Sequence, residues 1–131
     1  MSDIPTDRRY TADHEWVRIE SEDADGTRAR IGISDFAQDA LGDIVFVDLP
    51  EVDREVSVGE TIAEVESTKS VGEVYAAVSG RVVAVNEALT DEPELVNAEP
   101  YGRGWIVEVR LADPGEFEEL LTADAYEATL G

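Results

Sequence analysis

Cysteine is absent from the 131-residue chain, and histidine occurs once, as His14. The lack of cysteine excludes disulfides, thiolate nucleophiles and cysteine-based zinc sites. One histidine is too few for a histidine-rich metal site or an HExxH motif. A Ser-His-Asp triad would have to use His14, and no serine lies in the G-x-S-x-G context that favours such a nucleophile. These absences argue against most hydrolytic and metal-dependent chemistry.

Long apolar runs are missing as well. No run approaches the roughly 20 residues that a helix needs to cross a bilayer, so we expect no membrane span. The first sixteen residues contain no apolar segment of the secretory-signal type, which favours a cytoplasmic location. The composition is 43% hydrophobic and 31% charged, as in folded globular proteins, and the length suits one domain over residues 1–131.

Basic residues are scarce: 10 stand against 31 acidic ones, which gives a net charge of −21. Such a surface repels a phosphate backbone, so we expect no nucleic-acid partner. The acids are spread along the chain from Asp3 to Glu127. We interpret them as adaptation to a salt-rich cytoplasm, where dense carboxylates keep a protein hydrated and salt screens their repulsion. A patch directed at a basic partner is the alternative interpretation.

Lysine is rarer still, because nine of the ten cations are arginine and Lys69 is the only lysine. Arginine supplies charge everywhere else in the chain, so the amine of Lys69 itself is the candidate functional group. An amine can be acylated to a stable amide, whereas a guanidinium does not give that linkage. The competing interpretation is a lysine that survives by chance on a surface turn.

Hydrophobic patterning predicts a mainly β protein. We expect strands at 15–20, 27–33, 44–49, 61–66, 71–78, 82–86 and 105–111. Helical segments are expected at 35–41, 92–97, 115–121 and 123–130, the first capped by Ser34 and closed by Gly42, the last two preceded by the caps Asp113 and Thr122. Many short strands with peripheral and C-terminal helices favour an antiparallel sandwich or barrel.

Lys69 falls between two of these strands. Residues 67–70 are short, polar and free of large apolar groups, which is the composition of a hairpin tip. The sequence therefore predicts that Lys69 lies at the tip, with its side chain free of the core.

The segment around Lys69 resembles the attachment segment of lipoyl and biotinyl carrier domains, in which a lysine at a hairpin tip is amidated by the cofactor. The resemblance is carried by residues 59–69 and by Ala76-Ala-Val-Ser-Gly80. Biotinyl domains usually flank this lysine with methionine, whereas Thr68 and Ser70 flank it here. Glu66, three residues before the lysine, also resembles the lipoyl domains rather than the biotinyl domains.

Nearly the whole chain, from Tyr10 to Tyr126, resembles one family within that group, the H proteins of the glycine cleavage system. The matching segments are 10–17 (YTADHEWV), 31–38 (IGISDFAQ), 41–50 (LGDIVFVDLP), 65–69 (VESTK), 73–76 (EVYA), 85–89 (VNEAL), 95–97 (LVN), 100–102 (PYG) and Gly104-Trp105. An ordered set of this kind over one domain length is far more specific than the lysine motif alone.

The resemblance implies a barrel-sandwich hybrid fold and lipoic acid joined covalently to Lys69. It implies a monomeric carrier rather than an enzyme. The carrier would take an aminomethyl group from glycine decarboxylase to aminomethyltransferase, and its dithiol to dihydrolipoamide dehydrogenase. A lipoate ligase or a lipoyl/octanoyl transferase would load it.

In this family the loaded arm is held in a surface cleft of polar and acidic side chains. By position these are Glu15 and Glu73, with Asp13 adjacent, and an ammonium on the arm would be paired there. The chain departs from the family at Asp13 and Glu73, which replace the usual Ser and Asp. It departs again at Phe36, where histidine is common. We interpret His14 as a packing or hydrogen-bonding group.

Three other functions remain as alternatives. A lipoyl-relay protein would donate lipoyl groups to other carrier proteins. A biotin carrier is disfavoured by the missing methionines, and a hydrolase built on His14 is disfavoured by the lack of a nucleophile context.

Overall fold

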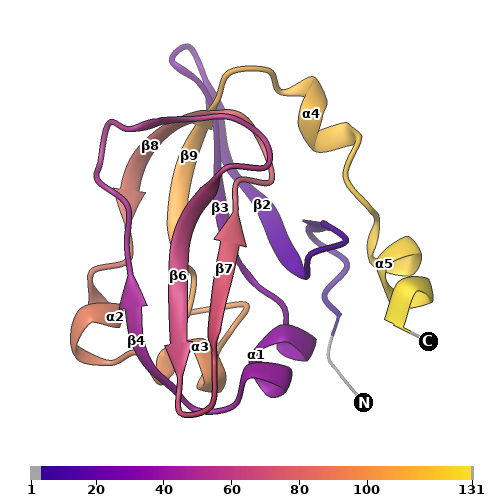
Figure 1. Cartoon of the computed structure of the whole chain (residues 1–131). Coiled ribbons are helices and arrows are strands. Elements are labelled where there is room, and N and C mark those ends of the chain that lie inside the picture. Colours follow the sequence, from indigo (N-terminus) through magenta and orange to yellow (C-terminus); the bar gives the residue numbers. More distant parts are fainter. Residues whose placement is uncertain (1–3, 131) are drawn as a thin grey trace.

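A computed structural model describes residues 4–130 and contains two antiparallel sheets with short helices around them (Figure 1). The strands are β1 (Arg9–Tyr10), β2 (Glu15–Asp23), β3 (Gly26–Ile33), β4 (Ile44–Asp48), β5 (Glu55–Val56), β6 (Thr61–Ser67), β7 (Val71–Tyr75), β8 (Gly80–Val85) and β9 (Val107–Leu111). The helices are α1 (Asp35–Leu41), α2 (Ala88–Asp91), α3 (Leu95–Ala98), α4 (Gly115–Glu118) and α5 (Ala123–Leu130). The mainly β class predicted from the sequence is confirmed.

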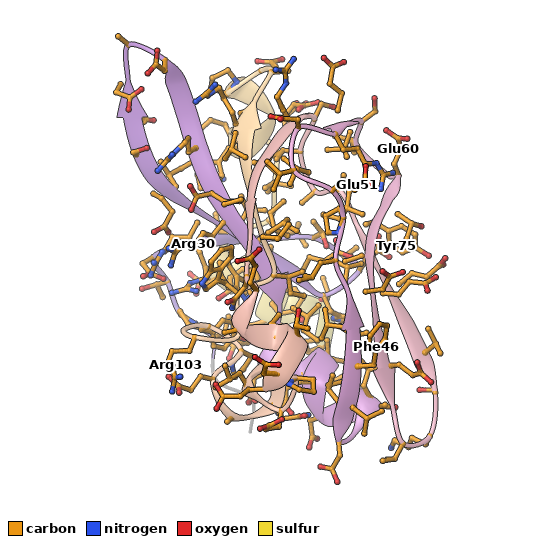
Figure 2. The ribbon with its side chains drawn as sticks, turned by 90° about the vertical axis from the view of Figure 1, so that its left-hand side faces the viewer. Arg30, Phe46, Glu51, Glu60, Tyr75 and Arg103 are labelled. Atoms are coloured by element: carbon orange, nitrogen blue, oxygen red, sulfur yellow. The ribbon has the colours of Figure 1, made fainter. Side chains whose placement is uncertain are left out.

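The larger sheet has the strand order β1-β2-β3-β9-β8-β5, and the smaller sheet has the order β4-β6-β7. All pairings are antiparallel. The β6–β7 hairpin supplies two of the three strands of the smaller sheet, and its tip lies at the same end of the molecule as α1 (Figure 1). The two sheets pack as layers, and Figure 2 shows Arg30 of the larger sheet on the opposite side of the molecule from Phe46 and Tyr75 of the smaller one.

Alternation along the strands places the core between these layers. In β6, Ala63, Val65 and Ser67 are buried whereas Glu64 and Glu66 are exposed, which is the period of two expected for a half-buried strand. Buried residues of both sheets, including Ile31 of the larger and Val74 of the smaller, form one continuous apolar cluster. A second, smaller cluster joins Tyr10 and Trp16 to Ala123 and Tyr126, so it fastens α5 to the start of the chain.

Helix α1 forms where its capping residues predict. The Ser34 hydroxyl accepts a hydrogen bond from the Ala37 amide at 3.2 Å, which satisfies one of the free N–H groups of the first turn. Gly42 ends the helix with φ of 85°, a conformation that glycine adopts without the steric cost of a Cβ atom.

Several element predictions are wrong in their bounds: β2 continues to Asp23 rather than 20, β8 begins at Gly80 rather than 82, and α4 ends at Glu118 rather than 121. The strand expected at 71–78 ends at Tyr75, because Ala76 leaves the smaller sheet and hydrogen-bonds the backbone of Gly59 and Glu60 instead. Residues 76–78 are nonetheless buried, and a buried crossover has the same apolar composition as a strand. The last strand begins at Val107 rather than 105, and the helical turn expected at 92–97 is α3, from Leu95 to Ala98.

β1, β5 and α2 were not predicted from the sequence, and each has four residues or fewer. None of the helices within residues 4–130 is long and apolar enough to cross a membrane.

Candidate functional site

Lys69 lies at the tip of the β6–β7 hairpin, as the sequence predicts. The tip is held by Ser67, whose hydroxyl oxygen accepts hydrogen bonds from the Lys69 amide at 3.2 Å and the Ser70 amide at 3.0 Å. The same hydroxyl donates to the Ser70 carbonyl at 3.0 Å, and the Ser67 amide donates to that carbonyl at 2.8 Å. One buried side chain thus fixes the backbone on both sides of the lysine.

The tip is also docked against the end of α1. The Thr68 amide donates to the Asp43 carbonyl at 3.1 Å. A Cβ atom added at Gly42 would lie 3.1 Å from Cε of Lys69, so the lysine stem passes over the glycine that ends the helix. Asn97 supports this segment from the other side, because its side chain donates to the Gly42 carbonyl at 2.9 Å and accepts from the Ile44 amide at 2.8 Å.

The amine of Lys69 is left available. The side chain is exposed, and within residues 4–130 no carboxylate lies within ion-pair distance of it. Glu66 is exposed on β6, between Phe46 on β4 and Val71 on β7. The structure gives it no hydrogen bond to Lys69.

Glu15 is the unusual acid of the structure, because its side chain is only 1% exposed. Its carboxylate accepts from the Thr11 hydroxyl at 2.9 Å and from the Tyr75 backbone amide at 3.0 Å, which joins the start of β2 to the end of β7. Burial raises the pKa of Glu15 to about 7; the two hydrogen bonds oppose that rise, and the nearby charge of Asp13 adds to it.

The other predicted acids gather around Tyr75. The Tyr75 hydroxyl donates to the Glu73 carboxylate at 2.9 Å. This hydrogen bond, with the charges of Glu73, Asp13 and Glu15, raises the pKa of Tyr75. The structure therefore brings Glu15, Glu73 and Asp13 together around Tyr75, although only Glu15 of the three is buried.

This acidic group lies along β7 from the lysine. Glu73 is four positions after Lys69, so their Cα atoms are at most about 14 Å apart. A group attached to the Lys69 amine and several atoms long can span that distance. The arrangement thus combines an accessible amine at a rigid tip with carboxylates within reach of whatever the amine carries.

His14 is a hydrogen-bonding group, as expected. Its Nδ1 atom lies 2.8 Å from the Tyr126 hydroxyl, which in turn lies 2.7 Å from the Ser34 hydroxyl. Burial lowers the pKa of His14, and its ring contacts Phe36 at 4.7 Å between centroids. Ser34 is fully buried and caps α1, so it offers no accessible nucleophile. The geometry gives no support to a hydrolase.

Sequence reasoning missed the roles of Ser67, Thr11, Tyr75 and Asn97. Tyr75 and Asn97 lie in segments that carry the family resemblance, which was the available signal. Among residues 4–130, no group of three or more histidine, aspartate or glutamate side chains is arranged to hold a metal ion.

Comparison with known proteins agrees with this geometry. The sequence model of the family described as glycine cleavage H-protein matches residues 8–131. Proteins named glycine cleavage system H protein from Mycobacterium avium (strain 104) and Escherichia coli O45:K1 are each 54% identical to this chain, over 134 and 130 residues, covering 99% of it and 98% of each relative.

A solved structure extends the agreement to the fold. The crystal structure of a glycine cleavage system H protein from Mycobacterium marinum matches with a TM-score of 0.87 and 48% identity, covering 98% of this chain and 99% of that one. The barrel-sandwich hybrid fold expected from the sequence is therefore confirmed. Because the family pattern spans nearly the whole chain and full-length relatives share more than half of its residues, the chain belongs to the glycine cleavage H-protein family.

Proposed function

We propose that this chain is the lipoyl-bearing shuttle of the glycine cleavage system, with Lys69 as its attachment residue. The observation that carries the proposal is the single lysine, presented without an ion pair at a hairpin tip that Ser67 holds rigid. Family membership supplies the system in which such a carrier works.

The residues at the tip suit a covalent lipoyl group. The Lys69 amine is exposed, and an amide formed there would leave the backbone hydrogen bonds of the hairpin intact. The stem lies over a glycine, so no side chain crowds it from α1. When bound, a lipoyl group supplies a disulfide that can be reduced and can accept an aminomethyl group. A lipoate ligase or a lipoyl/octanoyl transferase is the class of enzyme that would attach it.

The acids on and beside β7 serve the cargo rather than the attachment. An aminomethyl group carries an ammonium, and Glu73 and Asp13 would pair with it in a site where Glu15 adds a buried acceptor. A cation near Glu15 lowers the pKa of that carboxyl, so arrival of the cargo favours loss of its proton. These residues bind and orient; none is placed to break a bond.

The proposed cycle has three partners. Glycine decarboxylase loads the aminomethyl group, aminomethyltransferase removes its methylene and releases ammonia, and dihydrolipoamide dehydrogenase reoxidises the dithiol. The chain itself is then a carrier component and not an enzyme, and the cofactor does the chemistry while the protein positions it.

A reconstituted exchange reaction tests the proposal. The chain is lipoylated with a lipoate ligase and mixed with glycine decarboxylase, glycine and labelled bicarbonate, and incorporation of label into the carboxyl group of glycine is measured. We expect exchange with the wild type and none with Lys69→Arg, which keeps the charge but cannot be amidated. If the lipoylated wild type supports no exchange while the lipoylated E. coli relative does, the shuttle proposal is wrong.

The lipoyl-relay alternative gives a different result in a paired assay. A relay protein would pass its lipoyl group to the lysine of an unmodified carrier domain when a lipoyltransferase is added. Transfer without exchange would favour the relay, whereas exchange without transfer supports the shuttle.

A further inference from the structure

A concavity of about 660 Å³ lies at the start of β8 and the end of β9. These strand ends are at the opposite end of the molecule from the β6–β7 tip (Figure 1). The lining of the concavity comes from β5, β8, β9 and the residues next to them, and includes Ser57, Ser79, Arg81 and Arg110. No part of the proposed lipoyl site contributes to it. The presence of two arginines in one concavity is notable in a chain with so few cations.

These arginines belong to a row of like charges across the larger sheet. Arg28 of β3 pairs directly with Arg110 of β9, and Arg110 pairs directly with Arg81 of β8. Neighbouring strands lie about 4.8 Å apart, and like charges directly opposite one another destabilise a sheet. Three guanidinium groups in register therefore carry an energetic cost.

Arg110, in the middle of the row, is left without compensation. Arg28 pairs with Glu108 at 3.2 Å and Arg81 pairs with Glu55 at 3.2 Å. Within residues 4–130, the Arg110 side chain makes neither an ion pair nor a hydrogen bond, and its Nε atom is buried without a partner. Its stem passes over Gly26, where an added Cβ would lie 3.6 Å away. The guanidinium is thus held in place yet unsatisfied.

The rest of the same sheet face shows that acids were available. Arg30 is paired with Glu108 at 3.2 Å, and Arg18 with Glu20 at 2.6 Å. With 31 acids in the chain, an unpaired arginine flanked by two others is not explained by a shortage of carboxylates. Uncompensated positive charge is what an anion would relieve.

We propose that this concavity binds a small multivalent oxyanion, a phosphorylated or polycarboxylate molecule, through Arg110 and Arg81. Arg110 and Arg81 both line the concavity, and a planar guanidinium binds a phosphate or carboxylate through two parallel hydrogen bonds. The partner of Arg81, Glu55, is largely exposed, so its ion pair gives way to a ligand at little cost.

The distribution of charge favours a small ligand over an acidic protein surface. Beyond the concavity, Arg18, Arg28 and Arg30 are already paired with Glu20 and Glu108. Outside the concavity, the cations of residues 4–130 without an ion pair are Arg54 and Lys69. The net charge of −21 repels a large acidic partner over its whole surface.

Nuclear magnetic resonance of the arginine Nε–Hε groups and backbone amides tests the proposal on the full chain. Inorganic pyrophosphate and citrate are titrated separately at about 0.15 M ionic strength, which limits long-range repulsion to about 8 Å, and sodium chloride serves as the control. We expect saturable shifts at Arg110, Arg81 and the Gly80 amide. Arg110→Gln should weaken binding about tenfold or more, since a charge-assisted bond is lost.

The matched control is Arg103→Gln, which removes an exposed arginine paired with Glu92 and Glu99 and should leave binding unchanged. Where Arg110→Gln alters the fold, Arg81→Gln replaces it, because Arg81 is exposed. Saturation by pyrophosphate alone identifies a phosphate ligand, and saturation by citrate alone a carboxylate ligand. Polyglutamate is titrated as a third probe, to represent an acidic protein surface. The proposal is overturned if the shifts never saturate or if Arg103 shifts equally. It is also overturned if polyglutamate binds and neither small anion does.

Discussion

Replacing Glu15 with glutamine should make the stability of the protein less dependent on pH. The carboxyl is buried, and its pKa is about 7 in the folded protein against an ordinary value of 4.5. Glutamine has the same shape as the protonated acid. Its carbonyl can accept from the Tyr75 amide as the carboxylate does. Any change in the hydrogen bond from the Thr11 hydroxyl alters the stability of Glu15→Gln equally at every pH, because glutamine does not titrate.

The sign and size follow from proton linkage. The raised folded pKa means that the native state holds its proton more tightly than the unfolded chain, so the stabilisation is complete below pH 4.5 and is lost as pH rises to 7. At 1.36 kcal/mol per pKa unit, the full loss is about 3 kcal/mol. Between about pH 5 and about pH 8, the stability of the wild type should fall by roughly 2 to 3 kcal/mol relative to Glu15→Gln.

Urea unfolding of both proteins at a series of pH values measures this difference directly. Subtracting the two curves removes the pH dependence that the other 30 acids contribute. Glu127→Gln, an exposed acid on α5, serves as the matched control and should run parallel to the wild type. A difference between wild type and Glu15→Gln that stays constant from pH 5 to pH 8 would refute the claim that Glu15 is desolvated.

Three further results are expected. Ser67→Ala should loosen the tip and lower kcat/KM for lipoylation of Lys69 by a lipoate ligase. The control Thr68→Ala, at an exposed residue, should leave kcat/KM unchanged. Equal values for the two variants would show that lipoylation does not need the hydrogen bonds of Ser67. Asn97→Ala removes hydrogen bonds to Ile44 and Gly42 and should lower the free energy of unfolding by about 1–3 kcal/mol, measured by urea denaturation; no loss would contradict their structural role. Molar salt should raise the melting temperature by screening the net charge of −21, and a flat response would count against salt adaptation.

Local signals predicted the parts of the structure that depend on neighbouring residues. Ser34 and Gly42 gave both ends of α1, and the polar run between two apolar segments gave the hairpin tip with Lys69. These features need only a cap, a turn or an alternation within a few residues. They could therefore be recognised without knowing what packs against them.

The features that escaped prediction depend on distant partners. The family resemblance pointed to Glu15, but not to its burial. The carboxylate is buried where the start of β2 meets the end of β7, and it accepts a hydrogen bond there from the Tyr75 amide, sixty residues later in the chain. The end of β7 was misplaced because a crossover between sheets is as apolar as a strand. The unpaired state of Arg110 arises only when β3, β8 and β9 align in register.

The most direct test of the account is the mass of the chain after incubation with lipoate, ATP and a lipoate ligase, followed by peptide mapping. Because Lys69 is the only lysine, the account predicts the addition of one lipoyl group, located on the peptide that contains Lys69 and absent from Lys69→Arg. A chain that remains unmodified while the E. coli relative is lipoylated under the same conditions would contradict it.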